Sequence, residues 1–152
     1  MESYAHRIIY STLFQKHVSF ASYWHDTLHE ERYLRKCRFL PYLNNEINHK
    51  DADLFKKNIC QLNSMVLVMS HNEKIIEPRE SCHFCFYKQG SKTELMPLEQ
   101  TDIYKNDTLG LKILHESSRL HVRFANCTHD QFQEDEDNFV KNTLEFLRET
   151  IA

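Results

Sequence analysis

The amino-acid sequence predicts an α/β fold, with helices packed around a small and mostly parallel sheet. Residues 65–69 form a continuous apolar run with polar residues on both sides, which is typical of a parallel strand covered on both faces. Residues 120–124 alternate apolar and polar side chains, which indicates a strand with one drier face near a sheet edge. Apolar residues at helical spacing before, between and after these segments supply the helices.

Three helices are expected ahead of the first strand, at residues 2–18, 28–44 and 51–62. Asp51 and Asp53 mark the start of the third helix, because acidic residues are favoured in a first turn. Each segment carries apolar residues near helical spacing. Those of the first segment lie on one side of the helix, and we expect those of the third to face inward. The apolar residues of the three segments are Ile8, Ile9, Leu13 and Phe14, then Tyr33, Leu34, Cys37, Leu40 and Leu43, then Leu54, Phe55, Ile59 and Leu62.

The rest of the chain is predicted to add a short strand and two helical segments. Residues 84–88 indicate a strand that ends before Gly90, and residues 108–116 a helical turn. The acidic run 134–137 precedes a closing helix, where the helix dipole stabilises negative charge. Cation binding by that run is the alternative interpretation. The apolar residues of the closing helix are Val140, Leu144, Leu147 and Ile151.

The composition favours one globular domain or part of one. The chain has 152 residues, of which 41% are apolar and 27% charged, and its formal net charge is −3. This balance, with scattered basic residues, argues against a nucleic-acid partner. No apolar run approaches the ~18–20 residues of a membrane-spanning helix, and residues 1–14 lack the cleavage site of a signal peptide. We expect no cofactor.

The five cysteines do not form a disulfide framework, because their number is odd and their spacing irregular. Cys82 and Cys85 have CxxC spacing, but the motif does not open a helix as thioredoxin-like redox sites do. A zinc site needs further ligands. We therefore expect two thiols in and beside a short strand, one facing in and one out, and no metal site. A redox or zinc protein stays open as an alternative.

An acid and a histidine follow the two main strands. Glu73 and Glu77 come after the first strand, and His129 comes after the second. In open α/β sheets, functional groups collect in the loops beyond the carboxyl ends of strands. In α/β hydrolases the triad runs in the order serine, acid, histidine, so these residues fit its last two members. Either glutamate can be the acid on this pattern.

Several short motifs are informative through their order and spacing. They are Tyr23-Trp24-His25-Asp26, Val66-Leu67-Val68, Ile76-Glu77-Pro78, Phe84-Cys85-Phe86-Tyr87 with Gly90, Pro97-Leu98-Glu99, Leu109-Gly110-Leu111-Lys112, Leu120, His129, Gln131 and Phe146-Leu147. Together, from about Tyr4 to the last helix, they resemble the C-terminal half of the lysosomal palmitoyl-protein thioesterases.

The resemblance implies the C-terminal part of an α/β-hydrolase fold, with part of its lid helices and the last strands and helices of a mostly parallel sheet. Residues 1–62 would belong to the helical lid insertion. Residues 63–152 would supply the C-terminal strands and helices of the hydrolase core. The chain would then be one partial domain.

The resemblance also implies roles for individual residues. His129 falls on the family's catalytic histidine, two residues before a matching Gln131. Glu73 falls where the family has its triad aspartate, directly after a matching Asn72. Glu77, which the family also fills with an acid, is the second choice.

Three features depart from the family pattern. Glutamate at position 73 is one methylene longer than aspartate, and Asn126-Cys127-Thr128 stands where the family usually carries an acidic residue, glycine and aspartate. No G-x-S-x-G nucleophile motif occurs. We therefore expect the nucleophile and the oxyanion-hole amides to lie in an N-terminal half, and this chain to be inactive alone.

Two classes of function remain at this stage. The first is part of an enzyme that hydrolyses S-palmitoylated proteins or fatty acyl thioesters in the lysosome or after secretion, and Asn106 and Asn126 begin glycosylation acceptor patterns. The alternative is a non-catalytic, truncated relative that acts as a binding or regulatory module. If an N-terminal half is missing, one edge of strand 65–69 should lack a neighbour, and we expect a marginally stable chain that self-associates or is held by a partner supplying the missing strands. A stable monomer would instead favour the non-catalytic relative.

Overall fold

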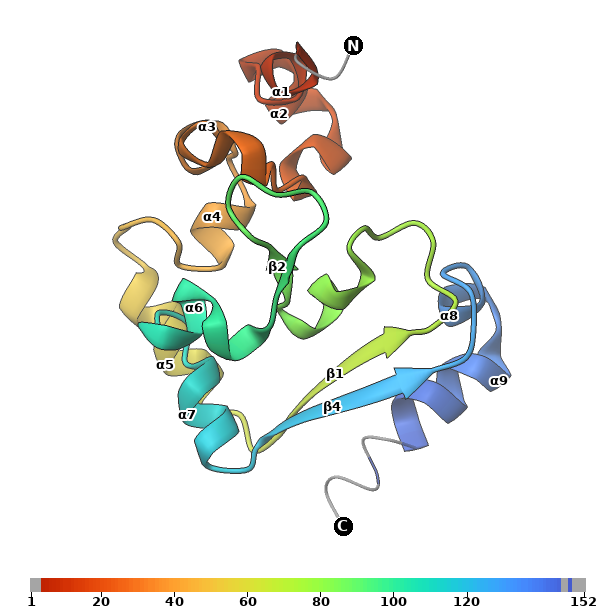
Figure 1. Ribbon diagram of the computed structural model, residues 1–152. Helices are drawn as coiled ribbons and strands as arrows, with labels where there is room; N and C mark the ends of the chain where they lie inside the picture. The colour runs from red at the N-terminus through yellow and green to blue at the C-terminus, as the bar shows by residue number, and fades with distance from the viewer. Residues whose placement is uncertain (1–3, 146–147, 149–152) are drawn as a thin grey trace.

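Two strands that lie far apart in the sequence pair in parallel. The computed structural model describes residues 4–145 and 148. In it β1 (Met65–Ser70) pairs along its whole length with β4 (Leu120–Ala125), with Ser70 opposite Ala125. Both carboxyl ends point the same way (Figure 1). The two predicted strands are confirmed, and the loops that follow them leave the same edge of the sheet.

The two faces of this strand pair are covered unequally. Leu67 and Met69 of β1 are buried, whereas Val66 and Val68 on the opposite face are half-buried, so the prediction of a strand covered on both faces holds only in part. The apolar face of β4 was expected to be the drier one, and this was wrong, because Phe124 is 51% exposed. The layer over that face is incomplete among the described residues.

The region before β1 is helical, as predicted, but in shorter pieces. The predicted helix 2–18 breaks after Ile9, because the Ser11 hydroxyl caps a new helix by accepting a hydrogen bond from the N–H of Phe14. The predicted helix 28–44 breaks ahead of Pro41, which is favoured in a first turn. The elements are α1 (Ala5–Ile9), α2 (Thr12–His17), η2 (Ser19–Tyr23), η3 (Thr27–His29), α3 (Glu30–Lys36), α4 (Leu40–Leu43) and α5 (Ala52–Cys60).

Several apolar residues of the predicted helices are exposed. Leu54 and Leu62 were predicted to face inward, and this was wrong, although α5 is unbroken. Ile8, Leu13 and Leu43 are exposed as well. An apolar cluster forms instead from residues on three separate elements. Its buried members are Tyr10, Tyr33 and Cys37, and Ile9, Trp24, Leu34 and Leu40 pack against it.

A second apolar cluster lies between β1 and β4 in sequence. The short strand predicted at 84–88 is confirmed only as β2 (Phe86–Tyr87), which pairs antiparallel with β3 (Leu95–Met96). The helical turn predicted at 108–116 appears as α7 (Leu111–Glu116). The other elements are η4 (Arg79–His83), η5 (Leu98–Gln100) and α6 (Asp102–Lys105), and the buried residues of the cluster are Leu98, Ile103, Leu109 and Leu111.

The chain closes in short helical pieces, α8 (Gln131–Glu134), α9 (Glu136–Phe139) and the π-helical η6 (Val140–Leu144). Asp135 accepts a hydrogen bond from the N–H of Asn138 at the start of α9 (3.2 Å), which agrees with a capping role for the acidic run. Leu147 and Ile151 of the predicted closing helix lie outside the described residues, as do the first residues of the predicted helix 2–18.

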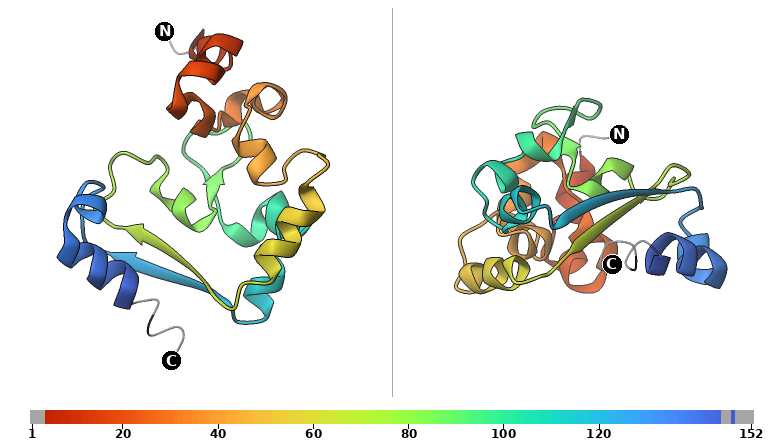
Figure 2. Two further views of the ribbon diagram at one scale, coloured as in Figure 1. Left: turned by 180° about the vertical axis from the view of Figure 1, so that it is seen from behind. Right: turned by 90° about the horizontal axis from the view of Figure 1, so that it is seen from below.

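The N-terminal helices lie to one side of the strand pair, and the β2–β3 hairpin lies between these helices and the strand pair (Figures 1 and 2). Two sets of hydrogen bonds tie the parts together. The Thr27 hydroxyl donates to the carbonyl of Ser91 (2.7 Å), and the N–H of Gly90 donates to the carbonyl of Thr27 (2.8 Å). The Asn45 amide donates to the carbonyl of Thr108 (2.9 Å).

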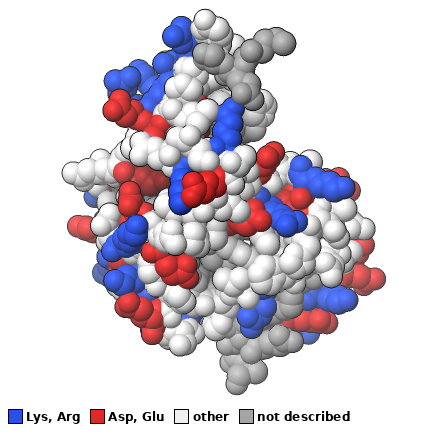
Figure 3. All heavy atoms as spheres, viewed as in Figure 1, with Lys and Arg blue, Asp and Glu red and all other residues white. Residues whose placement is uncertain are grey.

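The surface carries mixed charge. In Figure 3 basic and acidic side chains are interspersed on the visible face, without a broad patch of one sign. This distribution agrees with the net charge of −3 and does not resemble the basic footprint of a nucleic-acid partner. None of the helices in the described part of the chain has the length and apolar character of a membrane span.

We predict that Gly110→Ala destabilises the fold more than Gly90→Ala. Gly110 has a φ of +92°, and a Cβ there would lie 2.5 Å from the sulfur of Cys60. Gly90 has a φ of +79° with nothing near its added Cβ. Backbone strain costs both variants about 1–3 kcal/mol, and crowding should add about 1–3 kcal/mol at Gly110 alone. Urea denaturation measures both losses, and equal losses would contradict this packing.

Candidate active site

The loops after β1 and β4 bring an acid and a histidine into contact. Nδ1 of His129 lies 2.8 Å from Oε2 of Glu73. The contact follows from the parallel register, because Ser70 and Ala125 are partners and each loop starts directly beyond one of them. The structure therefore brings together the two residues that the sequence singled out. Glu77, the second choice for the acid, is exposed, and among the described residues the hydrogen-bond partner of His129 is Glu73.

Glu73 is held in place on both of its oxygens. Oε1 accepts hydrogen bonds from the N–H groups of Ile75 (2.6 Å) and Ile76 (3.1 Å), while Oε2 faces His129. The side chain is only 8% exposed. Burial by itself would raise the pKa of Glu73, but the hydrogen bonds from His129, Ile75 and Ile76 outweigh it and hold that pKa below its usual value. Glu73 is therefore a carboxylate at neutral pH.

An ionised Glu73 decides which nitrogen of His129 carries the proton. A carboxylate can only accept hydrogen bonds, so Nδ1 of a neutral His129 must be the donor. The lone pair then stands on Nε2, and the His129 side chain is 32% exposed. An imidazole held in this tautomer by a carboxylate can take a proton on Nε2, and the carboxylate stabilises the imidazolium that results.

The Ser70 hydroxyl joins the two loops behind this pair. Ser70 ends β1 and is 4% exposed. Its oxygen accepts hydrogen bonds from the N–H groups of Asn72 (3.1 Å), on the Glu73 side, and Cys127 (3.3 Å), on the His129 side. The hydroxyl in turn lies within donating distance of the Cys127 carbonyl. One side chain thus fixes the start of both loops.

Two hydrogen bonds between Thr128 and Gln131 also hold the loop that carries His129. The Gln131 side chain accepts a hydrogen bond from the N–H of Thr128 (2.9 Å), and the Thr128 hydroxyl accepts one from the N–H of Gln131 (3.4 Å). Cys127, which stands where the resemblance expects glycine, is not among the described residues with positive φ. The loop therefore presents His129 without needing a glycine.

The cysteines near this pair are poor nucleophile candidates. Burial raises the pKa of the Cys127 thiol and of the Cys82 thiol, and the charge of Glu73 raises both further. The expectation that one cysteine of the CxxC motif faces in and the other out was wrong. Cys82 lies in η4 rather than beside a strand, and Cys82 and Cys85 are both half-buried free thiols.

Sequence reasoning found Glu73 and His129 but missed Ser70. The signal was present, because Ser70 is a polar residue directly after an apolar run of five residues. A serine at the end of a buried strand is ambiguous in sequence, since one of its partners, the N–H of Cys127, lies 57 residues away.

The family model and the relatives that match this chain are described as thioesterases. The sequence profile of a family described as palmitoyl protein thioesterase matches residues 1–129. A palmitoyl-protein thioesterase 3 of Dictyostelium discoideum is 44% identical over 122 residues, which are 80% of this chain and 42% of that relative. A palmitoyl-protein thioesterase 1 of Caenorhabditis elegans is 38% identical over 80% of this chain and 40% of its own length. A lysosomal thioesterase of Homo sapiens is 33% identical over 75% of this chain and 37% of its own length. The chain thus spans about two fifths of the relatives it matches.

We predict that Glu73→Gln flattens the dependence of stability on pH. The pKa of Glu73 in the folded chain lies below its ordinary value of 4.5. The contribution of Glu73 to the free energy of unfolding is therefore complete above pH 4.5, and it is lost as the pH falls through the lower pKa of the folded state. From about pH 5 downward, the unfolding free energy of the wild type should fall more steeply than that of the variant. Urea denaturation across this range measures both slopes.

The exposed Glu77 provides the matched control for this comparison. Glu77→Gln should follow the wild-type curve. Wild-type and Glu73→Gln curves with the same slope would contradict the hydrogen bonding of Glu73.

Proposed function

Because this chain belongs to the palmitoyl protein thioesterase family, we propose that Glu73 and His129 are the acid and the base of a serine-hydrolase triad. The observation that supports these roles is the 2.8 Å contact between Oε2 of Glu73 and Nδ1 of His129. It lies beyond the carboxyl ends of two parallel strands, where α/β enzymes place their functional groups. The proposed reaction is hydrolysis of the thioester that joins palmitate to a cysteine.

In this reaction His129 takes the proton of a serine hydroxyl through Nε2 while the serine oxygen attacks the thioester carbonyl. The tetrahedral intermediate collapses, the carbon–sulfur bond breaks, and the imidazolium returns its proton to the departing thiolate. A water molecule then attacks the acyl-enzyme with the same base, which releases palmitate and the serine. Glu73 holds the required tautomer throughout and stabilises the imidazolium.

The serine must come from elsewhere in the enzyme. The sequence contains no G-x-S-x-G motif, and the chain spans 42% of the Dictyostelium discoideum relative. We propose that the nucleophile and the oxyanion donors lie in a segment outside these 152 residues, so that this chain alone does not turn over thioesters. In this arrangement residues 1–62 are part of a helical lid, and residues 63–152 are the C-terminal part of the hydrolase core.

A lysosomal location follows from the same proposal. Several relatives are named lysosomal thioesterases. Asn106 and Asn126, which begin glycosylation acceptor patterns, both have exposed side chains, as glycan attachment requires. S-palmitoylated proteins and other fatty acyl thioesters are the proposed substrates.

We further propose that the chain self-associates when it is alone. Among the described residues β4 is the only strand paired with β1, so the outer edge of β1 is open. Val122 and Phe124 on the adjacent strand are 41% and 51% exposed. An open strand edge favours strand addition by a second copy, and association would also cover the exposed apolar side chains of β4. Light scattering after size-exclusion chromatography should show oligomers, whereas a monomer of 18.3 kDa would count against this proposal.

The catalytic proposal is tested by placing this chain in the context of a complete enzyme. Residues 1–129 replace the matching segment of the Dictyostelium discoideum relative, and hydrolysis of a palmitoyl-cysteine peptide is followed. We expect an active chimera. His129→Ala and Glu73→Gln should each lower kcat by about 10⁴-fold, because triad members act as a unit.

Glu77→Gln in the same chimera is the control, and it should retain activity because Glu77 is exposed. A chimera in which Glu77→Gln removes activity and Glu73→Gln does not would overturn the assignment of the acid. A folded but inactive chimera that still carries the relative's own serine would favour the non-catalytic alternative.

A further inference from the structure

Helix α1 is anchored by a buried histidine instead of an apolar side chain. His6 is 7% exposed and is the buried residue of α1, whereas Tyr4 and Ile8 beside it are 62% and 53% exposed. Nδ1 of His6 is buried without a hydrogen-bond partner among the described residues. Buried polar atoms in proteins are nearly always satisfied. An unsatisfied imidazole nitrogen at the main anchor of a helix therefore points to a missing partner.

Two other metal-ligating side chains converge on His6. Nδ1 of His29 lies 2.9 Å from Oδ2 of Asp26, and the rings of His6 and His29 are stacked with centroids 3.6 Å apart. One donor atom from each of the three residues lies within 4.8 Å of the others. The side chain of Asp26 is 9% exposed and that of His29 is 38% exposed, so the group is sheltered yet reachable from solvent.

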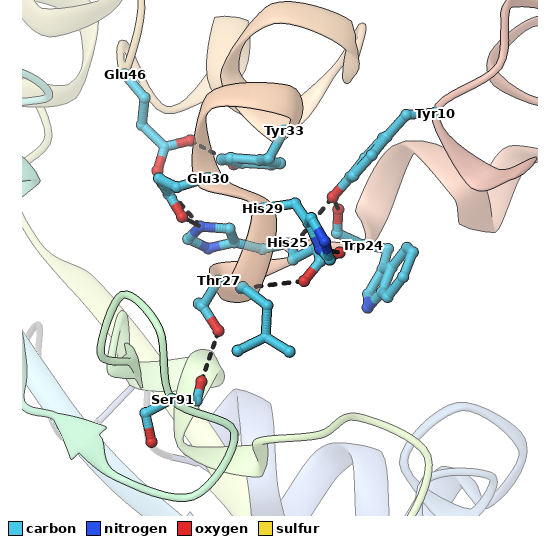
Figure 4. Close-up of polar contacts among 11 residues, drawn as sticks. Tyr10, Trp24, His25, Thr27, His29, Glu30, Tyr33, Glu46 and Ser91 are labelled. Carbon is cyan, nitrogen blue, oxygen red and sulfur yellow. Dashed lines mark hydrogen bonds and ion pairs between the residues drawn. The ribbon is translucent and has the colours of Figure 1, made fainter. Parts of the chain in front are cut away.

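A neighbouring histidine, His25, has a different hydrogen-bond partner. Figure 4 shows His25 turned toward Glu30, whereas His29 lies on the side of the segment that faces Tyr10. Nε2 of His25 is 2.9 Å from Glu30. His25 therefore has the Glu30 carboxylate as its hydrogen-bond partner, and the group of His6, Asp26 and His29 is separate from this contact.

We propose that His6, Asp26 and His29 form a binding site for a divalent transition-metal ion, with Zn²⁺ as the best fit. Two imidazoles and one carboxylate are donors that Zn²⁺ accepts, and a fourth position would be left for water. Donor atoms bind Zn²⁺ at roughly 2.0–2.2 Å, so they lie about 3.3–3.5 Å apart around a tetrahedral ion. The observed group has to contract modestly and its two rings have to unstack, which side-chain rotation allows.

The local charges both help and oppose the ion. The positive charges of Arg7 and Arg32 act on His6, and so does the negative charge of Asp26. Arg7 and Arg32 also repel a cation, whereas the Asp26 carboxylate attracts it. Removing the exposed Arg7 should therefore tighten binding by a small factor, most visibly at low ionic strength.

An ion at this site would cross-link α1 to the segment that contains Asp26 and His29. That segment is joined to the rest of the molecule through Thr27 and Ser91. The ion would therefore fix the N-terminal helices on the remainder of the chain. This role is structural and is independent of the pair formed by Glu73 and His129.

The test uses the full chain and two ions. Co²⁺ reports its ligands by its absorption spectrum, and Zn²⁺ affinity is measured against a chromophoric chelator. We expect a Co²⁺ spectrum of nitrogen and oxygen ligation without thiolate charge transfer, and a rise in Tm when Zn²⁺ is added. His29→Ala and His6→Gln should each weaken Zn²⁺ binding at least tenfold and remove the rise in Tm.

His17→Ala is the matched control, because His17 is an exposed histidine of α2 outside the group, and it should bind Zn²⁺ as the wild type does. His29 is more exposed than His6, so its substitution keeps the test valid if His6→Gln does not fold. Zn²⁺ affinity unchanged in His29→Ala, or a Co²⁺ spectrum dominated by thiolate charge transfer, would overturn the proposal.

Discussion

The parallel pairing of β1 with β4 is the constraint on which the rest of this structure depends. Parallel strands cannot be joined by a tight turn, so the chain between residues 70 and 120 must travel back across the molecule. That segment carries the buried cluster of Leu98, Ile103, Leu109 and Leu111. The same pairing sends both following loops out of one edge of the sheet, and the contact between Glu73 and His129 is its direct consequence.

Local chemistry then turns this proximity into a defined geometry. The Ser70 hydroxyl accepts hydrogen bonds from N–H groups of both loops. The N–H groups of Ile75 and Ile76 hold the oxygen of Glu73 that does not face His129. Glutamate is longer than the aspartate that the resemblance leads one to expect. Both oxygens of Glu73 nevertheless find hydrogen-bond partners in this loop.

The sequence predicted where β1 and β4 lie, but it failed on which face of β4 is covered and on where the helices break. Apolar runs identified β1 and β4, and the rule that functional groups follow parallel strands placed Glu73 beside His129. Helical spacing could not reveal the cap at Ser11, which divides the predicted helix into two pieces on which Ile8 and Leu13 are exposed. The group of His6, Asp26 and His29 was not predicted either. His6 of α1 meets Asp26 and His29, which begin and end η3, only through tertiary packing.

The tautomer of His129 is the measurement that tests the central claim most directly. Long-range proton–nitrogen correlation NMR of the full chain, at a pH where the imidazole is neutral, shows which ring nitrogen carries the proton. The hydrogen bond to Glu73 predicts the proton on Nδ1 and a free lone pair on Nε2. A neutral His129 ring with its proton on Nε2 would contradict the contact with Glu73 and the proposed role of His129 as a base, which rests on that contact.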